Sequence, residues 1–388
     1  MKAQILNAVK NNIRFDRNEL AGAFGDIGTD LPLIIGMITV SGIDSASTFI
    51  IYGLLQMASG LYYGIPMAVQ PLKAVATIVI AQHLTGDVIY GGGLAIGLIM
   101  LVMTITGLLK KLSLIVPKAV IRGVQFGLGL SLAKIALTDY IVTNSDVFDW
   151  ILIVVTFGIT FFLIGNRKYP AAIIVVSIGI VYSLCFNVSF LELFSGGIKF
   201  DYPKLNIPTS ENIVQGFILL ALPQIPLSIG NSILASEQLV KDLYPEKKIT
   251  SSRIGFTYSL MNIVSPFFSG IPVCHGSGGL AGHYAFGART GGSVFIYGIF
   301  FLLVGLIFSQ KVDLIISIFP MQVLGVILFF EPYILISLVK DLGKVKNELV
   351  LALFVGLISF GLPYGFLIAM VLGTLLFYLF PKFKFLQF

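Results

Sequence analysis

Two short stretches of this chain carry proline and polar residues inside otherwise apolar sequence. The first reads Ile-Pro-Met-Ala-Val-Gln-Pro-Leu-Lys from Ile65 to Lys73, and the second reads Ile-Pro-Val-Cys-His-Gly-Ser-Gly-Gly from Ile271 to Gly279. Both predict breaks in membrane helices, and a broken segment at membrane depth must line a cavity or pack on protein. Corresponding broken segments in the two halves of a hydrophobic chain indicate a transporter's binding site.

Each break predicts a short extended stretch followed by a half-helix that begins at mid-membrane. We expect extended backbone over 65–70 and 271–274, and Pro71 suits the first turn of the first half-helix, where its missing N–H costs nothing. The glycines within 276–279 would leave backbone N–H groups uncovered, so that a ligand can approach them. Two helix N-termini are therefore expected to face one place.

The chemistry expected at this place is the binding of an anion. A helix N-terminus carries the equivalent of about +0.5 charge, so two such ends and Lys73 give a focus of about +2. A tetrahedral dianion matches that charge and accepts hydrogen bonds from every side. Burying a lysine in a membrane costs about 2.5–3.5 kcal/mol, so we favour binding for Lys73 over snorkelling or permanent pairing with Asp26. The residues predicted to bind substrate are Thr29, Gln70, Lys73, Gln224, Asn231, His275, Gly276, Ser277, Gly278 and Gly279.

Two carboxylates lie in a glycine-rich turn of the first apolar segment, at Asp26 and Asp30. Asp26 either neutralises Lys73 or takes part in proton coupling, and both readings are open. Protonation of Asp26 or Asp30 would remove negative charge as an anion enters, so that uptake would follow an inward proton gradient. We therefore predict Asp26 and Asp30 as the proton-coupling residues.

Several other polar residues have a plain structural alternative. Gln224 and Asn231 can equally supply interhelical hydrogen bonds, and Lys134 lies near a predicted outer segment end, where it is expected to snorkel. His275 and His283 are eight residues apart without an acidic neighbour, which fits no zinc spacing. We predict no metal and no cofactor, and the absence of a P-loop motif argues against direct use of ATP.

The composition predicts an all-α membrane protein. Hydrophobic residues make up 56% of 388 positions and charged residues 11%, against about 25% charged in soluble domains. A span needs about 20 apolar residues, so the chain has room for about fourteen segments. The expected segments are 19–40, 46–64, 66–83, 89–109, 117–138, 147–165, 170–187, 212–235, 250–269, 271–288, 290–309, 312–336, 348–361 and 363–381.

The distribution of basic residues predicts the orientation. With the N-terminus in the cytoplasm, most of the 25 lysines and arginines fall in cytoplasmic stretches, as the positive-inside rule requires. Residues 1–18 are expected to form an amphipathic segment on the cytoplasmic surface rather than a signal peptide. Both termini are then cytoplasmic. The net charge of +6 follows from this distribution and predicts no nucleic-acid partner.

The two breaks also predict how the chain is organised. The breaks lie in the third and tenth predicted segments, and each of these is the third segment of one half when the fourteen segments are divided into two halves of seven. Because seven is odd, the second set enters the membrane with opposite topology, which predicts an inverted repeat. The expected parts are a first repeat over 19–187, an extracytoplasmic connecting loop over 188–211 and a second repeat over 212–388.

Four motifs in order resemble the molybdate-transporter branch of the sulfate permease superfamily. They span Glu19–Thr29, Pro66–Lys73, Leu222–Asn231 and Pro272–Ala281, the last with Phe286–Gly292. The resemblance implies a fourteen-helix inverted repeat with a core and a gate domain, and substrate held between segments three and ten. It also implies an elevator-like movement and homodimers. Members of this branch are linked to molybdate, sulfate or both. Most sulfate permeases end in a soluble regulatory domain called STAS, which the molybdate branch commonly lacks, and we expect no STAS domain in the sequence up to Phe388.

Three other functions are weighed against this one. A nucleobase–proton symporter of the same fold typically needs carboxylates in segments eight and ten, and Leu222–Asn231 and Pro272–Gly287 contain none. An uncoupled anion channel stays open, since sequence does not separate it from a carrier. A membrane enzyme is disfavoured because no nucleophile–base pair or metal cluster has a plausible spacing.

Overall fold

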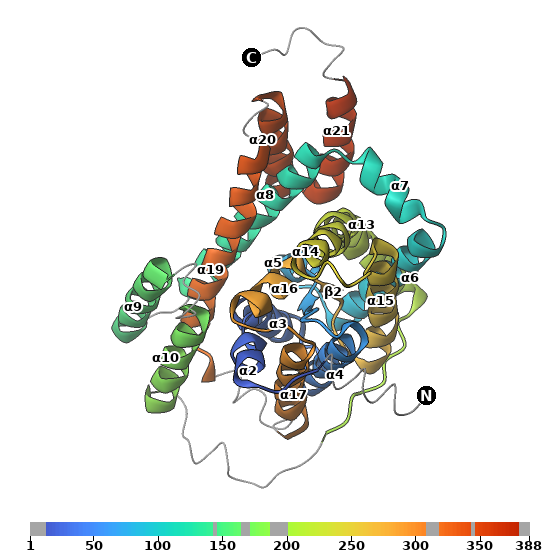
Figure 1. The fold of residues 1–388 in the computed structure, drawn as a ribbon. Helices are drawn as coiled ribbons and strands as arrows, with labels where there is room; N and C mark the ends of the chain where they lie inside the picture. The colour runs from blue at the N-terminus through green and yellow to red at the C-terminus, as the bar shows by residue number, and fades with distance from the viewer. Residues whose placement is uncertain are drawn as a thin grey trace, which may run out of the picture.

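The computed structural model of this protein describes residues 13–142, 146–163, 171–186, 201–307, 318–342 and 346–379. Helices dominate these residues, and the two strands assigned among them pair with each other. Figure 1 shows two groups of elements. We call them the inner bundle, which surrounds the strands, and the outer arc, which runs along one side of that bundle. The all-α class predicted from composition is confirmed.

The inner bundle contains both strands and their neighbours in each half of the chain. From the first half it takes α2 (Arg17–Ala23), α3 (Ile27–Ser41), α4 (Ser45–Tyr63), β1 (Val69–Pro71), α5 (Lys73–Gln82) and α6 (Gly86–Ile105). From the second half it takes α12 (Ser210–Gly216), α13 (Leu222–Leu227), α14 (Ala235–Leu243), α15 (Ser251–Val264), β2 (Val273–His275), α16 (Ser277–Ala285) and α17 (Gly292–Ile307).

The outer arc consists of the remaining long helices. They are α8 (Lys118–Ile135), α9 (Val147–Leu163), α10 (Ala171–Phe186), α19 (Met321–Ser337), α20 (Lys346–Gly361) and α21 (Gly365–Leu379). A short helix that the sequence did not predict, α7 (Leu108–Ile115), runs from α6 to α8 and joins the two groups (Figure 1). α19 contacts α3, and α8 contacts α5 and α13, so the arc packs on the bundle where the half-helix α5 lies.

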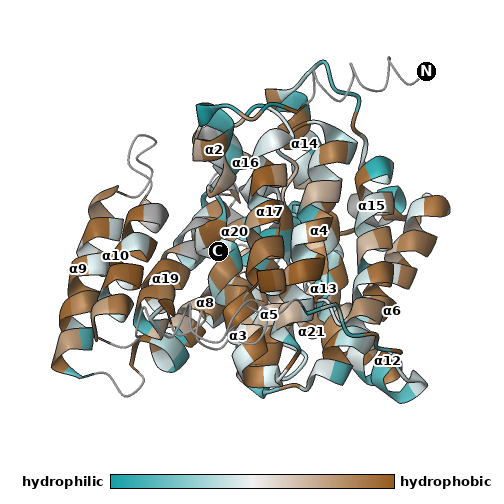
Figure 2. Ribbon diagram, turned by 90° about the horizontal axis from the view of Figure 1, so that it is seen from below, coloured by the Kyte–Doolittle hydropathy of each residue, from teal (hydrophilic) through white to brown (hydrophobic). Residues whose placement is uncertain are grey.

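Long apolar helices run through the fold, with at least half of the residues in each most apolar stretch buried. Three described helical runs are long and apolar enough to cross a membrane, namely Gly86–Ile105, Lys118–Ile141 and Ser210–Leu243. A fourth is added if α2 and α3, which meet at 41°, form one bent span. Figure 2 shows hydrophobic residues along α9, α10 and α17, with hydrophilic residues gathered near α2 at one end of the fold and near α12 at the other. The count of about fourteen spans stays a prediction.

The predicted breaks are present, and their extended parts form an antiparallel pair. Gln70 lies opposite Cys274, Pro71 lies opposite Val273, and every residue of both strands is buried. The expectation that Pro71 belongs to the first helical turn is wrong. The Leu72 N–H donates to the Pro272 carbonyl, just before the opposite strand, at 3.1 Å. Pro71 and Val273 therefore form a non-hydrogen-bonded pair, in which the missing N–H of proline breaks no hydrogen bond between the strands.

Two side-chain amides complete the hydrogen bonding of the strands. Gln56 on α4 donates to the Val69 carbonyl at 2.6 Å and accepts from the Val69 N–H at 3.0 Å. Asn262 on α15 does the same for Val273, at 2.6 and 2.9 Å. An amide can both donate and accept, so each of these side chains replaces a missing strand neighbour. Sequence reasoning identified neither residue.

The two halves of the chain make matching contacts. Ser59 on α4 donates to the Met67 carbonyl, and Ser265, just after α15, donates to the Ile271 carbonyl. α4 packs on α17 and α15 packs on α6; in the arc, α8 packs on α20 and α9 on α19. These pairs are the ones that an inverted repeat of seven segments would exchange.

Close helix packing in the bundle depends on glycine. A Cβ added at Gly53 would lie 2.6 Å from the Gly298 carbonyl oxygen, and one added at Gly298 would lie 2.6 Å from the Gly53 carbonyl oxygen. Small residues allow such backbone approach between membrane helices. The contact between α4 and α17 therefore has no room for a larger side chain at either position.

The described part of the connecting segment, 201–209, is fastened to the ends of two bundle helices. The Lys204 N–H donates to Ser47 at 2.9 Å, and its ammonium forms an ion pair with Asp44, the N-cap of α4. Burial on its own would raise the pKa of the Asp44 carboxyl, but hydrogen bonds from Lys204 and Ser47 outweigh burial and lower the pKa. The Asn206 N–H donates to the Phe267 carbonyl at 2.9 Å.

The expected segments agree with the helices except in a few places. The segment predicted over 212–235 is a longer run from Ser210 to Leu243, interrupted by π-helical stretches at Phe217–Ala221 and Ser228–Leu234. The amphipathic segment 1–18 and the connecting loop 188–211 lie largely outside the described residues, as do 312–317 of the twelfth segment.

The first testable prediction concerns the contact between α4 and α17. Gly53→Ala should lower the thermal unfolding midpoint of detergent-solubilised protein, because overpacking a tight contact costs about 1–3 kcal/mol. Gly361→Ala is the control, since a Cβ there meets nothing within 4 Å. Equal midpoints for the two variants would contradict the packing described here.

Candidate functional site

The two half-helices start at opposite ends of the strand pair. α5 follows β1 after the N-cap Leu72, and α16 follows β2 after the N-cap Gly276. Because the strands are antiparallel, the helices leave the pair in opposite directions, and neither N-cap side chain satisfies the first N–H groups. Other parts of the chain reach both N-termini, and they differ in charge.

The N-terminus of α5 is capped by Gln224. The Gln224 Oε1 accepts hydrogen bonds from the Ala74 and Val75 N–H groups at 3.0 and 3.2 Å. Its Nε2 donates to Ser228 at 3.0 Å, and the Ser228 hydroxyl is 2.7 Å from the Tyr258 hydroxyl. A neutral side chain thus occupies the N–H groups that the sequence assigned to an anion. Gln224, predicted as a ligand, is a helix cap in this structure.

The N-terminus of α16 lies against a carboxylate. The Gln70 Nε2 donates to both oxygens of Asp26, at 2.8 and 2.7 Å. A Cβ added at Gly279, in the first turn of α16, would lie 2.4 Å from the Asp26 Oδ2, and one added at Gly276 would lie 1.4 Å from the Gln70 Oε1. A side chain at either position would displace Asp26 or Gln70 from this contact. Gly278 differs, since it is exposed and a Cβ there meets nothing within 4 Å.

Lys73, Asp26 and Asp30 form one buried cluster of charge-bearing groups. Asp26 and Lys73 both act electrostatically on Asp30, and all three act on the buried Cys274. Asp30 is fully buried; its Oδ2 accepts from the Tyr297 hydroxyl at 3.2 Å, and its Oδ1 has no hydrogen-bond partner among the described residues. An ionised carboxylate is expensive in such a place.

The remaining predicted ligands lie around this cluster with different surroundings. His275 is buried, with Nε2 2.9 Å from the Thr257 hydroxyl and Nδ1 3.3 Å from the Ala68 carbonyl. Both ring nitrogens thus have protein partners, so His275 packs the strand against α15. Thr29, Asn231 and Ser277 are half-buried, on α3, on the π-helical stretch before α14 and at the start of α16.

A buried glutamate that sequence reasoning missed fixes the loop before α17. The Glu19 Oε1 accepts from the Arg289 and Thr290 N–H groups at 2.9 and 2.8 Å, and Oε2 accepts from the Ser293 N–H at 3.0 Å. Glu19 is 2% exposed. The first and last motifs of the resemblance therefore contact each other. An acidic residue in one motif and a glycine-rich turn in the other were the available signal.

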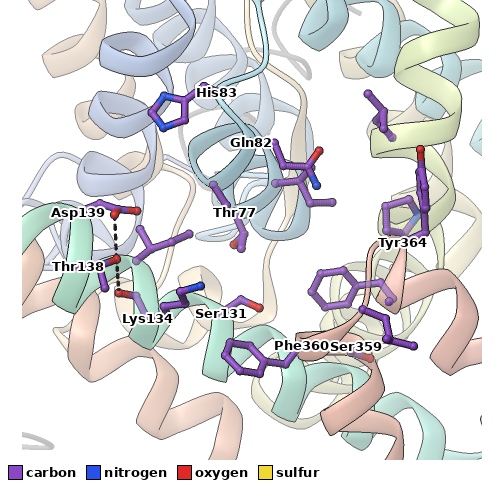
Figure 3. A pocket seen from close by; sticks show the side chains of 18 residues that line it. Thr77, Gln82, His83, Ser131, Lys134, Thr138, Asp139, Ser359, Phe360 and Tyr364 are labelled. Atoms are coloured by element: carbon purple, nitrogen blue, oxygen red, sulfur yellow. Dashed lines mark hydrogen bonds between the residues drawn. The ribbon is translucent and has the colours of Figure 1, made fainter.

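A cavity of about 300 Å³ lies beside α5, between the inner bundle and the outer arc. Figure 3 shows its walls, formed by the C-terminal half of α5, the end of α8 and the turn between α20 and α21. None of the ten predicted ligands lines it. Among the described residues, no group of three His, Cys, Asp or Glu side chains is placed to hold a metal ion.

Comparison with known proteins places this site in a family. A family model described as "Molybdate transporter of MFS superfamily" matches residues 18–132 and 216–335. "Molybdate transporter 2" of Arabidopsis thaliana is 33% identical over 86% of this chain and 81% of its own length. The chain belongs to the molybdate transporter family. "Molybdate transporter 1" of the same plant is 30% identical, over 89% of this chain and 85% of its own. The relatives are transporters, and this family member is not an enzyme.

Solved structures define the fold of this molybdate transporter family member. The transmembrane domain of the cyanobacterial bicarbonate transporter BicA superposes with a TM-score of 0.66 at 18% identity, over 90% of this chain and 98% of that one. Murine Solute Carrier 26 family member A9, an anion transporter in its inward-facing state, gives 0.69 at 12% identity, over 97% and 71%. At these identities the likeness shows the fold, which is that of integral membrane transporters.

The second testable prediction concerns Glu19. Glu19→Gln should lower the thermal unfolding midpoint in detergent, because a charged acceptor of three buried N–H groups becomes a neutral one, at a cost of about 1.5–3 kcal/mol. Glu211→Gln, at an exposed position in the first turn of α12, removes the same charge and should leave the midpoint within error. An unchanged midpoint for Glu19→Gln would show that these hydrogen bonds do not hold the turn.

Proposed function

We propose that this protein is a secondary active transporter of a tetrahedral oxyanion, molybdate and/or sulfate, taken up together with protons. The observation that carries the proposal is the meeting of two half-helix N-termini with Lys73 and two carboxyls in one buried cluster. Family membership supports the substrate class, since the relatives are named as molybdate transporters. The oxyanion binds between α5 and α16, with Lys73 as its cationic partner and Ser277 and Gly278 at the open side of α16.

The charges of the cluster give the proton a role. One lysine against two carboxylates leaves a formal charge of about −1, and two helix N-termini of about +0.5 each cancel it. The focus of about +2 expected from the sequence omitted Asp26 and Asp30. A dianion is attracted only when one or both carboxyls are protonated, so binding of anion and binding of proton favour each other. The hydrogen bonds from Gln70 hold Asp26 where this exchange takes place.

Binding also requires Gln224 to leave the N-terminus of α5. An oxyanion would replace the Gln224 carbonyl oxygen at the Ala74 and Val75 N–H groups, and a charged acceptor makes the stronger hydrogen bond there. The released amide keeps its hydrogen bond to Ser228, the residue that follows α13. This exchange leaves no buried N–H without a partner at either stage, which keeps its cost low.

Movement of the inner bundle against the outer arc provides alternating access. The two bodies correspond to the core and gate domains of an elevator, built from an inverted repeat of 19–187 and 212–388. Their interface includes Ile121 of α8, whose side chain lies 2.9 Å from the position of a Cβ on Gly230, and an apolar patch around Pro226 and Leu227. This patch offers no polar contact to break, whereas the Tyr140 hydroxyl, just after α8, donates to the Pro32 carbonyl on α3 at 3.1 Å, a hydrogen bond that the movement must exchange.

We further propose that the protein lies in a plasma or inner membrane with both termini cytoplasmic, and that it forms a homodimer.

The third testable prediction concerns Lys73. In proteoliposomes, wild-type protein should accumulate labelled sulfate, with competition by molybdate, and Lys73→Ala should reduce initial uptake by about 10- to 100-fold through loss of a charged contact. Lys111→Ala, an exposed lysine on α7, is the charge-matched control. Absence of saturable oxyanion accumulation by wild-type protein, or normal uptake by Lys73→Ala, would contradict the proposal. Dissipation of an imposed gradient without accumulation would identify an uncoupled channel.

The fourth testable prediction concerns the carboxyls. Lowering the external pH should increase wild-type uptake, because protonation removes negative charge from the site. Asp26→Asn or Asp30→Asn should make uptake independent of an imposed pH difference, since each fixes one carboxyl in a neutral form. Asp87→Asn, exposed in the first turn of α6, should respond as wild type. Unaltered pH dependence in both site variants would exclude these carboxyls from coupling.

A further inference from the structure

The cavity between the bundle and the arc contains two buried hydroxyl groups that the site above does not use. Thr77 on α5 is 3% exposed and Ser359 on α20 is 4% exposed, and both line the cavity. Neither hydroxyl has a hydrogen-bond partner among the described residues. A buried hydroxyl without a partner costs free energy, so a pair on opposite walls of one cavity indicates that a polar occupant is missing.

Cationic and further hydroxyl groups reach the same space from α8. Ser131 and Lys134 line the cavity, and Figure 3 shows the Lys134 side chain extending toward Ser131 and Thr77. No described carboxylate lies within ion-pairing distance of Lys134. Lys134 is exposed as well as lining the cavity, so its predicted snorkelling to the membrane interface stays a prediction. The Ser131 hydroxyl already donates to the Gly127 carbonyl at 3.1 Å, so the donors available to an occupant are the Lys134 ammonium and the hydroxyl groups of Thr77 and Ser359. An ammonium and two hydroxyl groups suit an oxyanion better than a cationic ligand.

Two other titratable groups line the cavity and must be weighed. Asp139 accepts a hydrogen bond from the Thr138 hydroxyl at 2.8 Å, and His83 ends α5. In Figure 3 both lie on the side of the cavity away from Ser131 and Ser359. Thr138 also donates to the Lys134 carbonyl at 3.0 Å, so Asp139 lies on the side of the cavity from which the Lys134 side chain extends toward Thr77.

The cavity leads toward the half-helix tip. Thr77 is four residues after Lys73 on α5, so the two side chains share a helix face and are separated by about 6 Å along the axis. Pro223, the neighbour of the capping Gln224, also lines the cavity. The side chain that must leave the α5 N-terminus for binding thus lies next to the inner wall. By the predicted orientation, the cavity is on the extracytoplasmic side.

We propose that this cavity is a second oxyanion site, formed by Thr77, Lys134 and Ser359, at which substrate binds before it displaces Gln224. The inference rests on the proposed transport function. It assigns to the outer arc a part in recognising substrate, through Lys134 and Ser359. Movement between bundle and arc separates Thr77 from Ser359, so this site exists only while the cavity is formed.

Transport kinetics test the site directly. Thr77→Val, Ser359→Ala and Lys134→Gln should each raise the KM for molybdate by about three- to tenfold at low ionic strength, with maximal rate within about twofold of wild type. The Lys134→Gln effect should shrink as salt increases, because screening already weakens the charge in wild type. Lys111→Gln is the control and should leave KM unchanged. Unchanged KM in all three variants overturns the second site while leaving the proposed function intact, whereas a wild-type protein that moves no oxyanion removes both.

Chemical labelling gives a second, independent readout. In a Cys185→Ser background, Thr77→Cys or Ser359→Cys should react with a membrane-impermeant thiol reagent added outside, and molybdate should slow the reaction. The protection should persist when Lys73→Ala is added, because the central site is then disabled and the outer site is not. Reaction from the inside only, or protection that disappears with Lys73→Ala, contradicts an outer site. The background protein alone reports any reaction at the buried Cys274.

Discussion

The structure depends on holding two stretches of non-helical backbone inside a membrane protein. Lipid offers no hydrogen bonds to such backbone, so every N–H and C=O must find a partner within the chain. The strands satisfy half of these groups by pairing, and the side-chain amides of Gln56 and Asn262 satisfy the groups that face away from the pair. With the pair fixed, the half-helices must begin at its two ends, and the charged cluster, the capping glutamine and the cavity all take their positions from those ends.

The two half-helix N-termini contact different groups of the protein. The end of α5 is bonded to the neutral amide of Gln224, and the end of α16 lies against the Asp26 carboxylate. A dianion can exchange with an amide without changing the charge of the site, but beside a carboxylate it meets repulsion unless a proton binds. In the proposed mechanism, this difference assigns entry of the anion to the α5 side and coupling to the α16 side. In the same mechanism, Gln70 on β1 donates to Asp26 and so holds the coupling carboxylate beside the break.

Much of the fold could be predicted from the sequence, because apolar runs and turn residues report helices directly. Proline and glycine at 65–73 and 271–279 located both breaks. Pro71 was misplaced because strand pairing with residues two hundred positions away decides where the helix begins. The roles of Gln224, Glu19 and Asn262 depend on contacts between distant segments, which no local pattern reports. The local charge was overestimated for the same reason, since only the fold brings Asp30 beside Lys73.

The most direct test of the account is an experimental structure of the protein with molybdate or the heavier tungstate, whose metal atom identifies the anion by anomalous scattering. The account predicts a peak between the N-termini of α5 and α16, with the Ala74 and Val75 N–H groups bonded to the anion and the Gln224 side chain turned away. An anion bound elsewhere, with Gln224 still capping α5 at saturating ligand, would contradict it.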